Sequence, residues 1–351
     1  MTDNYNIIVL IIADNNINNI DQSIASIQQQ SFDQKRIRTI VIDNGSSDGT
    51  YEKLINYSRI KNISVYRFSS KRPRTRLLYF ANSILKYFNY GYISILQPGD
   101  ILYPDYIAKH AALMDKYATT GRGLVISEAD ITDKNGNRVP QTPVFSDDCI
   151  LLKYKHYPYI LTNGSGHYVQ CFYGKNIILE PLSDLPVCID FTDMFKIAAY
   201  AFKTDIIYIK EPLSLINPVK KEDPVYDLIL RLLLVTRLDM VNSVRFSEIA
   251  HNDSDDAPGM DEINTQLCSL SLQYAIDALY TGDYSVTKKA LLFAEMLKHD
   301  IVKSKTYHLI KQALISRKLP ETNTGNLLHR KTVDSPPGSL LINRQLQNIR
   351  F

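Results

Sequence analysis

Two hydrophobic periodicities alternate along the first hundred residues. Continuous runs of β-branched and aliphatic residues predict buried strands at 7–12 and 39–42, and two further strands are predicted at 64–68 and 92–96. Between these runs, apolar residues recur at helical spacing, as Ile20, Ile24 and Ile27 do, and Thr50 is a candidate N-cap for a short helix. Strands that alternate with helices predict right-handed βαβ units and a mostly parallel, Rossmann-like α/β sheet, which residues 123–126 extend.

The strand pattern fades in the second half of the chain, where helical spacing continues without it. Residues 270–297 predict a helical hairpin with its turn at 281–283, and the last part of the chain is polar. The hairpin is a candidate surface for a homo-oligomer or for another partner. We therefore divide the chain into an α/β domain at 1–222, an all-helical domain at 223–318 and a polar tail at 319–351.

Composition narrows the functional classes. Hydrophobic residues make up 45% of the chain and charged residues 22%, which is typical of a globular protein. The 40 Lys and Arg residues and 37 Asp and Glu residues leave a net charge of +3, so charge predicts no nucleic-acid partner. No apolar run approaches the roughly 18 residues of a membrane span, and the N-terminus lacks a signal-peptide pattern, which predicts a cytoplasmic protein.

The cysteines carry no metal-site pattern. Cys149, Cys171, Cys188 and Cys268 have no CxxC spacing. Such isolated cysteines predict buried thiols in a reducing compartment rather than a zinc site or a disulfide framework.

Polar side chains gather where the predicted strands end. The four groups are Asp14–Asn16, Asp43–Asn44, Ser69–Arg76 and Gln97–Asp100. Ligands of an open parallel sheet bind beyond the carboxyl ends of its strands, and acceptors together with arginine suit a nucleotide. Each group taken alone is more often only a turn between a strand and a helix. No GxGxxG motif follows a strand, which argues against a dinucleotide-dependent dehydrogenase.

Several of these segments together resemble a known family. Residues 8–16, 22–24 and 30–31 are similar to the opening of family 2 glycosyltransferases, and the stretch Val41–Thr50, with the sequence VIDNGSSDGT, is the most specific. Residues 76–105 and 190–198 continue the resemblance, which covers about residues 6–217. It implies the GT-A fold and the transfer of a sugar from a nucleotide-sugar donor with inversion at the anomeric carbon.

The resemblance also implies roles for individual residues at the strand ends. Asp43 and Asn44 would contact the base and ribose of the nucleotide, and Arg76 matches an arginine that contacts the nucleotide in relatives. Asp14 and Gln97, which follow their own strands, complete the predicted nucleotide-sugar site.

The predicted catalytic base is Asp190, which matches the family residue that deprotonates the acceptor hydroxyl. An aspartate ahead of a helix is often only an N-cap, and in that case Asp193, three residues further on, is the alternative base. The acidic residue that commonly precedes the base in the family is here Ile189.

The metal-binding DxD motif of the family is altered. Gln97-Pro98-Gly99 takes its place, so Asp100 alone remains as a candidate metal ligand. Mg²⁺ bound to a diphosphate often needs only one or two protein carboxylates, so Asp100 can still be expected to hold Mg²⁺ or Mn²⁺. The missing carboxylates also fit an alternative function, a catalytically silent subunit that binds a nucleotide or a glycan.

The resemblance further implies a setting, namely bacterial surface polysaccharide synthesis at the cytoplasmic face of the cell membrane. The acceptor would be a glycan or a lipid-linked molecule. Two basic runs, Lys35–Arg38 and Lys71–Arg74, are either solvated faces or attract a diphosphate or the anionic lipid of a peripheral membrane contact. His167, in the loop Gly164–Tyr168, is a further candidate on the acceptor side, although a lone histidine is more often a surface residue.

Overall fold

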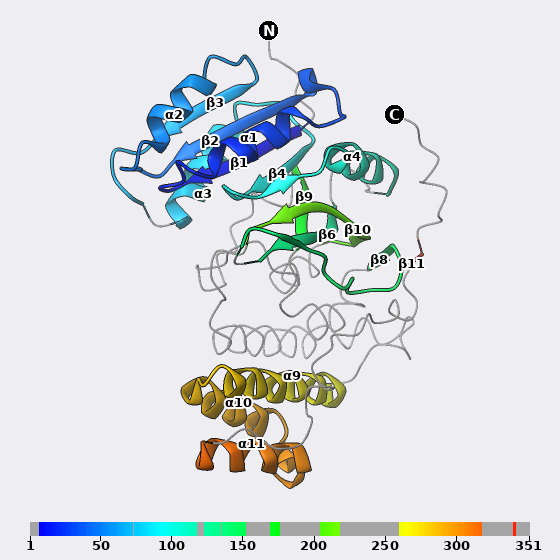
Figure 1. The fold of residues 1–351 in the computed structure, drawn as a ribbon. Helices are drawn as coiled ribbons and strands as arrows, with labels where there is room; N and C mark the ends of the chain where they lie inside the picture. Colours follow the sequence, from blue (N-terminus) through cyan, green and yellow to red (C-terminus); the bar gives the residue numbers. More distant parts are fainter. Residues whose placement is uncertain are drawn as a thin grey trace. The chain divides into compact units, whose positions relative to one another are not determined.

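The computed structural model describes the chain in eight segments: 7–72, 74–117, 123–133, 135–151, 169–175, 204–217, 260–317 and 340–341. These segments fall into two compact units. The first contains the sheet, and the second contains the helices of residues 260–317 (Figure 1). The predicted domain boundary at residues 222 and 223 lies outside the described residues, so it stays a prediction.

Four parallel strands form the first half of the sheet, as the sequence predicts. They are β1 (Ile7–Ala13), β2 (Ile37–Asp43), β3 (Ile63–Arg67) and β4 (Tyr92–Leu96). They lie in the order β4-β1-β2-β3, and their hydrogen-bonded registers are parallel throughout. Almost every residue of β1 and β2 is buried, which is why these strands read as continuous apolar runs.

The other half of the sheet is mixed. Its strands are β5 (Ile101–Leu102), β6 (Leu124–Thr132), β7 (Arg138–Val139), β8 (Cys149–Leu151), β9 (Val169–Gly174), β10 (Ile206–Ile216) and β11 (Leu340–Leu341). Strand β9 runs antiparallel between β4 and β6, so β6 and its neighbour β10 regain the direction of β4. Strand β11 pairs with β8, so two residues of the predicted polar tail belong to the sheet.

Helices follow the strands of the first half, and the first two of them begin within one residue of the places that the sequence predicts. They are α1 (Ile20–Gln28), α2 (Thr50–Tyr57), α3 (Arg74–Leu85) and α4 (Tyr106–Tyr117), with a short 3-10 helix η1 (Gln34–Arg36) before β2. The main core joins Ile20, Ile24 and Ile27 of α1 to the odd-numbered residues of β1 and to buried residues of α4. The spacing of the three isoleucines therefore predicts the buried face of α1 correctly.

One predicted cap is wrong. Thr50 is the first residue of α2, and the N-cap is Gly49, whose φ of 94° lies in the left-handed region that glycine tolerates. The hydroxyl of Thr50 instead accepts a hydrogen bond from the backbone N–H of Asn16 at 2.8 Å. The side chain of Thr50 thus links two turns of the sheet unit and does not cap the helix.

The described residues of the second unit form helices, as expected. It contains α9 (Met260–Tyr280), α10 (Tyr284–Leu297), a 3-10 helix η3 (His299–Lys303) and α11 (Lys305–Ser316). Gly282, with φ of 75°, turns the chain between α9 and α10, and Asp283 caps α10 by accepting from the N–H of Val286 at 3.0 Å. Ala275, Ala290 and Ala294 are fully buried where these helices pack. The predicted hairpin is confirmed.

Three of the four cysteines lie in the described part of the chain. Cys149, Cys171 and Cys268 are buried and form no disulfide, in agreement with the prediction, and Cys188 lies outside the described residues. Within the described residues, no helix is long and apolar enough to cross a bilayer.

Candidate functional site

The carboxyl ends of the parallel strands bring the predicted polar groups to one edge of the sheet. Ala13 and Asp43 are register partners at the ends of β1 and β2, so Asp14 and Asn44 follow adjacent strands. Gln97 follows β4, the other neighbour of β1. Asp14, Asp43, Asn44 and the turn from Gln97 to Asp100 therefore share this edge, which we call the carboxyl edge.

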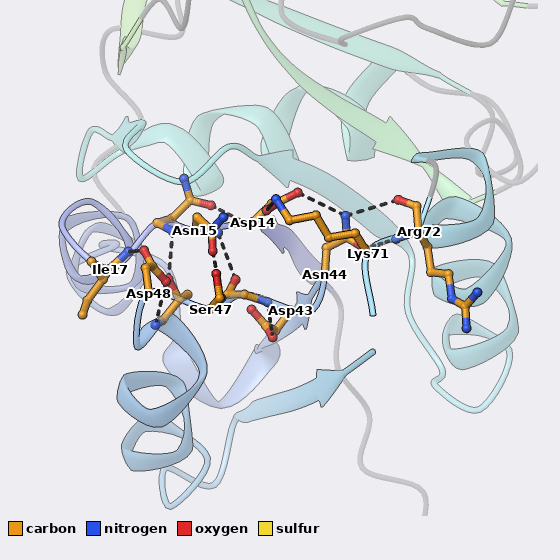
Figure 2. Close-up of polar contacts among 12 residues, drawn as sticks. Asp14, Asn15, Ile17, Asp43, Asn44, Ser47, Asp48, Lys71 and Arg72 are labelled. Carbon is orange, nitrogen blue, oxygen red and sulfur yellow. Dashed lines mark hydrogen bonds and ion pairs between the residues drawn. The ribbon is translucent and has the colours of Figure 1, made fainter. Parts of the chain in front are cut away.

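The turns after β1 and β2 are joined by side-chain-to-backbone hydrogen bonds (Figure 2). The N–H of Asn15 donates to Ser46 Oγ at 2.9 Å, and the N–H of Ser47 donates to Asn15 Oδ1 at 2.9 Å. The N–H of Ile17 donates to Asp48 Oδ2 at 3.0 Å. Asn15 itself adopts a φ of 55°, a left-handed conformation that asparagine tolerates better than most residues. Because the two turns hold each other, the floor of the carboxyl edge is ordered without a ligand.

Asp43 lies inside this floor. It is fully buried, and its Oδ2 accepts from the N–H of Ser46 at 3.2 Å and pairs with Arg67 Nε at 3.5 Å. Arg67 is the register partner of Asp43 on β3 and also stacks over the ring of Tyr51 at 4.2 Å. The Oδ1 atom of Asp43 is buried without a hydrogen-bond partner among the described residues, so one of its acceptor oxygens is unsatisfied within this part of the chain.

Asn44 holds the segment that follows β3. Its Oδ1 accepts from the N–H of Arg72 at 2.8 Å, and its Nδ2 donates to Arg72 O at 3.2 Å and to Asp14 Oδ2 at 3.3 Å. The oxygen and both N–H groups of the amide are therefore engaged within the chain. Asn44 therefore supports the segment that follows β3, and its direct contact with base and ribose stays a prediction.

Lys71 brings a positive charge to the carboxyl edge. Its Nζ lies 2.7 Å from Asp14 Oδ1, and the two side chains remain 58% and 39% exposed (Figure 2). The sequence shows only a basic run at residues 71–74. Such a run does not reveal whether a given lysine points into solvent or lies over the ends of the strands. An exposed lysine beside the ends of β1 and β2 can contact an anionic ligand.

Helix α1 holds the turn from Gln97 to Asp100. Ser23 Oγ accepts from the N–H of Gly99 at 2.8 Å and donates to Asp100 O at 2.8 Å, and Gln22 Nε2 donates to Gly99 O at 2.7 Å. Gly99 has φ of 106°, a conformation that few residues other than glycine adopt. Gln22 and Ser23 belong to the family-like sequence pattern, but their support of this turn was not predicted.

Asp100 points into the protein. It is 2% exposed, and its Oδ1 accepts from the N–H of Asn217, the residue after β10, at 2.9 Å. Its Oδ2 is buried and has no hydrogen-bond partner among the described residues. Burial raises the pKa of the Asp100 carboxyl to about 7, against a smaller opposing effect of the backbone N–H groups that it accepts from.

The geometry around Asp100 does not fit the metal site expected there. A divalent cation on a diphosphate needs a carboxylate oxygen that faces the ligand, whereas one oxygen of Asp100 is held by Asn217 and the other is enclosed. Nowhere in the described segments do three His, Cys, Asp or Glu side chains come close enough to hold a metal ion. We therefore assign Asp100 a structural role, in which it ties the end of β4 to the end of β10.

Two predicted residues cannot be placed with their side chains. Arg76 lies in the first turn of α3, but its side chain is outside the described part of the chain. Asp190, with its alternative Asp193, and the loop that contains His167 also lie outside the described residues. Their roles stay predictions.

Strand β6 carries two further buried carboxylates that were not predicted. Glu128 Oε1 accepts from Tyr208 Oη at 2.6 Å and from the N–H of Val144 at 2.7 Å. Asp130 Oδ2 accepts from Tyr103 Oη at 2.5 Å and pairs with Arg138 Nε at 2.5 Å. The apolar pattern of residues 124–126 marks the strand but gives no sign that its acidic residues are enclosed.

The sequence matches a family model over the sheet unit. Residues 8–173 match the model described as "Glycosyl transferase family 2". No curated protein sequence matches the chain.

Solved structures with a similar fold include the S. aureus protein TarS. The crystal structure of TarS 1–349 has a TM-score of 0.53 and 15% sequence identity, and the match covers 89% of this chain and 92% of that one. The same fragment in complex with UDP-GlcNAc has a TM-score of 0.52 and 16% identity, with coverage of 89% and 92%. In complex with UDP it has a TM-score of 0.51 and 15% identity over the same shares. At this level of identity the matches establish the fold, and the predicted GT-A-type α/β architecture followed by helices is confirmed.

Proposed function

We propose that the chain is a family 2 glycosyltransferase, because residues 8–173 match the model of that family, and that it transfers a sugar from a nucleotide-sugar donor to a hydroxyl of a glycan or related acceptor, with inversion at the anomeric carbon. The observation that carries this proposal is the carboxyl edge. This edge carries a buried aspartate with an unpartnered oxygen, Asp43, and an exposed cation, Lys71, which pairs with Asp14. Such an edge suits the base and phosphate ends of a nucleotide.

The nucleotide of the donor is proposed to be uridine diphosphate. The unpartnered Oδ1 of Asp43 is the proposed acceptor for the N3–H of a uracil ring, which presents a donor between two carbonyl oxygens. The structural neighbour TarS has been crystallised with UDP and with UDP-GlcNAc, which makes these two molecules the first to test. Guanosine diphosphate, whose base also presents N–H donors, is the comparison.

The proposed reaction is a single displacement. The acceptor oxygen attacks the anomeric carbon from the face opposite the diphosphate, the bond from that carbon to the diphosphate oxygen breaks, and its electron pair leaves with the diphosphate. Asp190 takes the proton of the acceptor hydroxyl, whose pKa lies far above neutral. The proposed reaction uses no metal ion, because the carboxylate geometry in the described part of the carboxyl edge does not fit a divalent cation.

We also propose a setting for this reaction. The buried cysteines Cys149, Cys171 and Cys268, which form no disulfide, suit a reducing compartment. We therefore expect the chain to act in the cytoplasm at the inner face of the membrane, on a glycan or lipid-linked acceptor of a surface polysaccharide.

A second candidate function is favoured by one observation, the replacement of the DxD carboxylates by Gln97-Pro98-Gly99. In that case the sheet unit binds a nucleotide sugar but does not turn it over. Binding of the donor without release of nucleoside diphosphate, under any acceptor and metal condition, would identify this silent form.

The test uses the full-length chain in two steps. The first measures the shift of the unfolding temperature with UDP, UDP-GlcNAc and GDP, and we expect UDP and UDP-GlcNAc to stabilise the protein. The second measures release of UDP from UDP-GlcNAc. A chain stabilised by none of the three nucleotides would contradict the proposed function.

Asp190→Asn and Asp193→Asn form a matched pair for the catalytic base. Asp190→Asn should slow UDP release by roughly 10²- to 10⁴-fold and leave UDP affinity within a few-fold, because an amide cannot take the acceptor proton. Asp193→Asn should be much milder. The opposite order would move the base to Asp193, and loss of UDP affinity in Asp190→Asn would make that residue part of the nucleotide site instead.

A further inference from the structure

We propose that Lys71 binds the diphosphate of the donor and neutralises it as it leaves, in the place that a divalent cation would otherwise take. The inference rests on the proposed function and adds to it the source of positive charge at the site. It follows from three features of the carboxyl edge. The carboxylates there already have partners within the chain, the segment after β3 is fixed in position, and Lys71 is exposed.

The described carboxylates of the carboxyl edge are already engaged within the chain. Asp43 is fully buried and pairs with Arg67, and Asp48 accepts from the backbone of Ile17 and from Thr50. Asp100 is enclosed and bound to the N–H of Asn217. The fourth carboxylate, Asp14, is 39% exposed and is paired with Lys71. A divalent cation would therefore have to displace Lys71 from Asp14, or else break one of the buried contacts at the cost of an unsatisfied N–H or an unpaired charge.

The segment after β3 is held in place at three points. The N–H of Phe68 donates to Asp43 O at 2.9 Å, and the N–H of Arg72 donates to Asn44 Oδ1 at 2.8 Å. Between them, the backbone of Ser70 lies so close to Gly45 that an added Cβ would be 2.9 Å from the Ser70 carbonyl carbon. Lys71 sits between two of these contacts, so its Cα is fixed beside the ends of β1 and β2.

The lysine has the exposure and the bonding capacity for a phosphate. Its side chain is 58% exposed, and its Nζ makes a contact of 2.7 Å with Asp14. An ammonium group carries three donors, so it can contact a phosphate oxygen while it keeps Asp14 as a partner. Charge-assisted hydrogen bonds of this kind are about twice as strong as neutral ones, and the developing negative charge of the leaving diphosphate strengthens them further.

The neighbouring cation provides a comparison within the same segment. Arg72 is exposed, and none of the described carboxylates pairs with its guanidinium, which extends away from Asp14 and Lys71 in Figure 2. A diphosphate held by net positive charge alone would depend on both residues. A diphosphate held at the Asp14–Lys71 position would depend on Lys71.

The test is isothermal titration calorimetry of the full-length protein with UDP and with uridine, in buffer that contains EDTA and in buffer that contains Mn²⁺. We expect the Kd of UDP to differ less than about three-fold between the two buffers. Lys71→Gln should weaken UDP binding by roughly 10- to 100-fold and leave uridine binding within about two-fold, because uridine carries no phosphate.

Two controls define the position of the charge. Lys61→Gln removes an exposed lysine that precedes β3, at the opposite edge of the sheet, and should leave UDP binding unchanged. Arg72→Gln should reduce UDP affinity less than about three-fold. The unfolding temperature of each variant checks that the fold is intact.

Four outcomes would overturn the inference. If UDP binding requires Mn²⁺, a metal ion and not Lys71 neutralises the diphosphate. If Lys71→Gln and Arg72→Gln lose the same UDP affinity, the diphosphate is attracted by the net positive charge of the segment and not by a lysine at a defined position. Equal weakening of UDP and uridine in Lys71→Gln would make Lys71 a support of the pocket. The fourth outcome, no binding of UDP, uridine or GDP in either buffer, contradicts the proposed function and removes this inference with it, whereas the first three leave the proposed function standing.

Discussion

At the scale of single residues, Glu128 shows what burial does to a carboxyl group in this fold. It is 2% exposed on β6, and Oε2 has no hydrogen-bond partner among the described residues, although Oε1 accepts two hydrogen bonds. Burial raises the pKa of Glu128 to about 7, because the hydrogen bonds from Tyr208 and Val144 offset only part of the desolvation of the carboxylate.

The sign of this shift predicts how stability depends on pH. The folded protein holds the Glu128 proton more tightly than the unfolded chain does, so its contribution to the free energy of unfolding is complete below about pH 4.5 and is lost as the pH rises through about 7. A shift of this size corresponds to about 3 kcal/mol. Glu128→Gln should therefore raise the unfolding temperature of the sheet unit relative to wild type at pH 8 and bring little gain at pH 4.5.

The control is Glu211→Gln on β10, where a carboxylate that is 52% exposed pairs with Lys109 at 2.6 Å. This variant should not change the pH dependence. Thermal unfolding followed by circular dichroism between pH 4 and 8 measures both effects. A Glu128→Gln variant that is least stable relative to wild type at pH 8 would show that the folded protein favours the ionised carboxylate.

The sequence predicts which residues lie at the carboxyl edge, but it does not predict the hydrogen bonds that their side chains make. Asp14, Asp43, Asn44 and Asp100 all follow strands, and strand order alone brings them to one edge. The partners of Asn44 and Asp100 are backbone groups of residues 72 and 217, which are distant in sequence. Such contacts depend on the tertiary arrangement of the loops, which the sequence pattern around each residue does not predict.

At the scale of elements, the turn after β2 shapes the wall of the site. Gly45 has φ of 70°, and the backbone of Ser70 fills the space that a side chain would need. Gly136, at φ of 81° in the turn before β7, has a similar conformation with no atom within 4 Å of an added Cβ. A comparison of alanine substitutions at these two glycines therefore separates the energetic cost of the left-handed backbone conformation from the cost of a steric clash with Ser70.

Gly136→Ala should lower the free energy of unfolding by about 1 kcal/mol, the cost of a left-handed conformation in alanine. Gly45→Ala adds a steric clash with the 69–72 segment, so we expect a loss of about 2–4 kcal/mol. UDP affinity should also fall by more than ten-fold in Gly45→Ala only, because the displaced segment carries Lys71. Urea unfolding and calorimetry measure the two effects, and equal effects of both variants would contradict the close packing.

The elements themselves followed from periodicity. The runs 7–12 and 39–42 and the isoleucines of α1 predicted strands and a helix in the places where they occur. The start of α2 was missed because Gly49 and Thr50 both suit a helix start, and the contact of Thr50 with Asn16 decides between them. Strand β11 has only two residues, too few to show a period.

At the scale of the whole molecule, the sheet unit and the helical unit each have a core of their own. The candidate site uses residues of the sheet unit, so we expect the helical unit to contribute nothing to UDP affinity. Self-association through the helical unit stays a prediction that light scattering of the full-length protein can test.

Ala294→Asp tests this independence in the full-length chain. Ala294 is fully buried in α10, and an unpaired carboxylate there should unfold the helical unit. Lys289→Asp, on the exposed face of the same helix, is the control. UDP affinity should stay within about two-fold in both variants, while Ala294→Asp loses helical signal. Loss of UDP binding in Ala294→Asp alone would show that the site needs the helical unit.

The central claim is that a nucleotide binds at the carboxyl edge, and hydrogen exchange of the full-length protein with and without UDP tests it most directly. If UDP binds there, amide exchange should become slower on addition of UDP in residues 13–17, 43–48, 68–72 and 97–100. Residues 61–63 at the opposite edge, and the helices of 260–317, should exchange as before. Protection confined to those helices or to the opposite edge, with none at the four turns, would contradict the account.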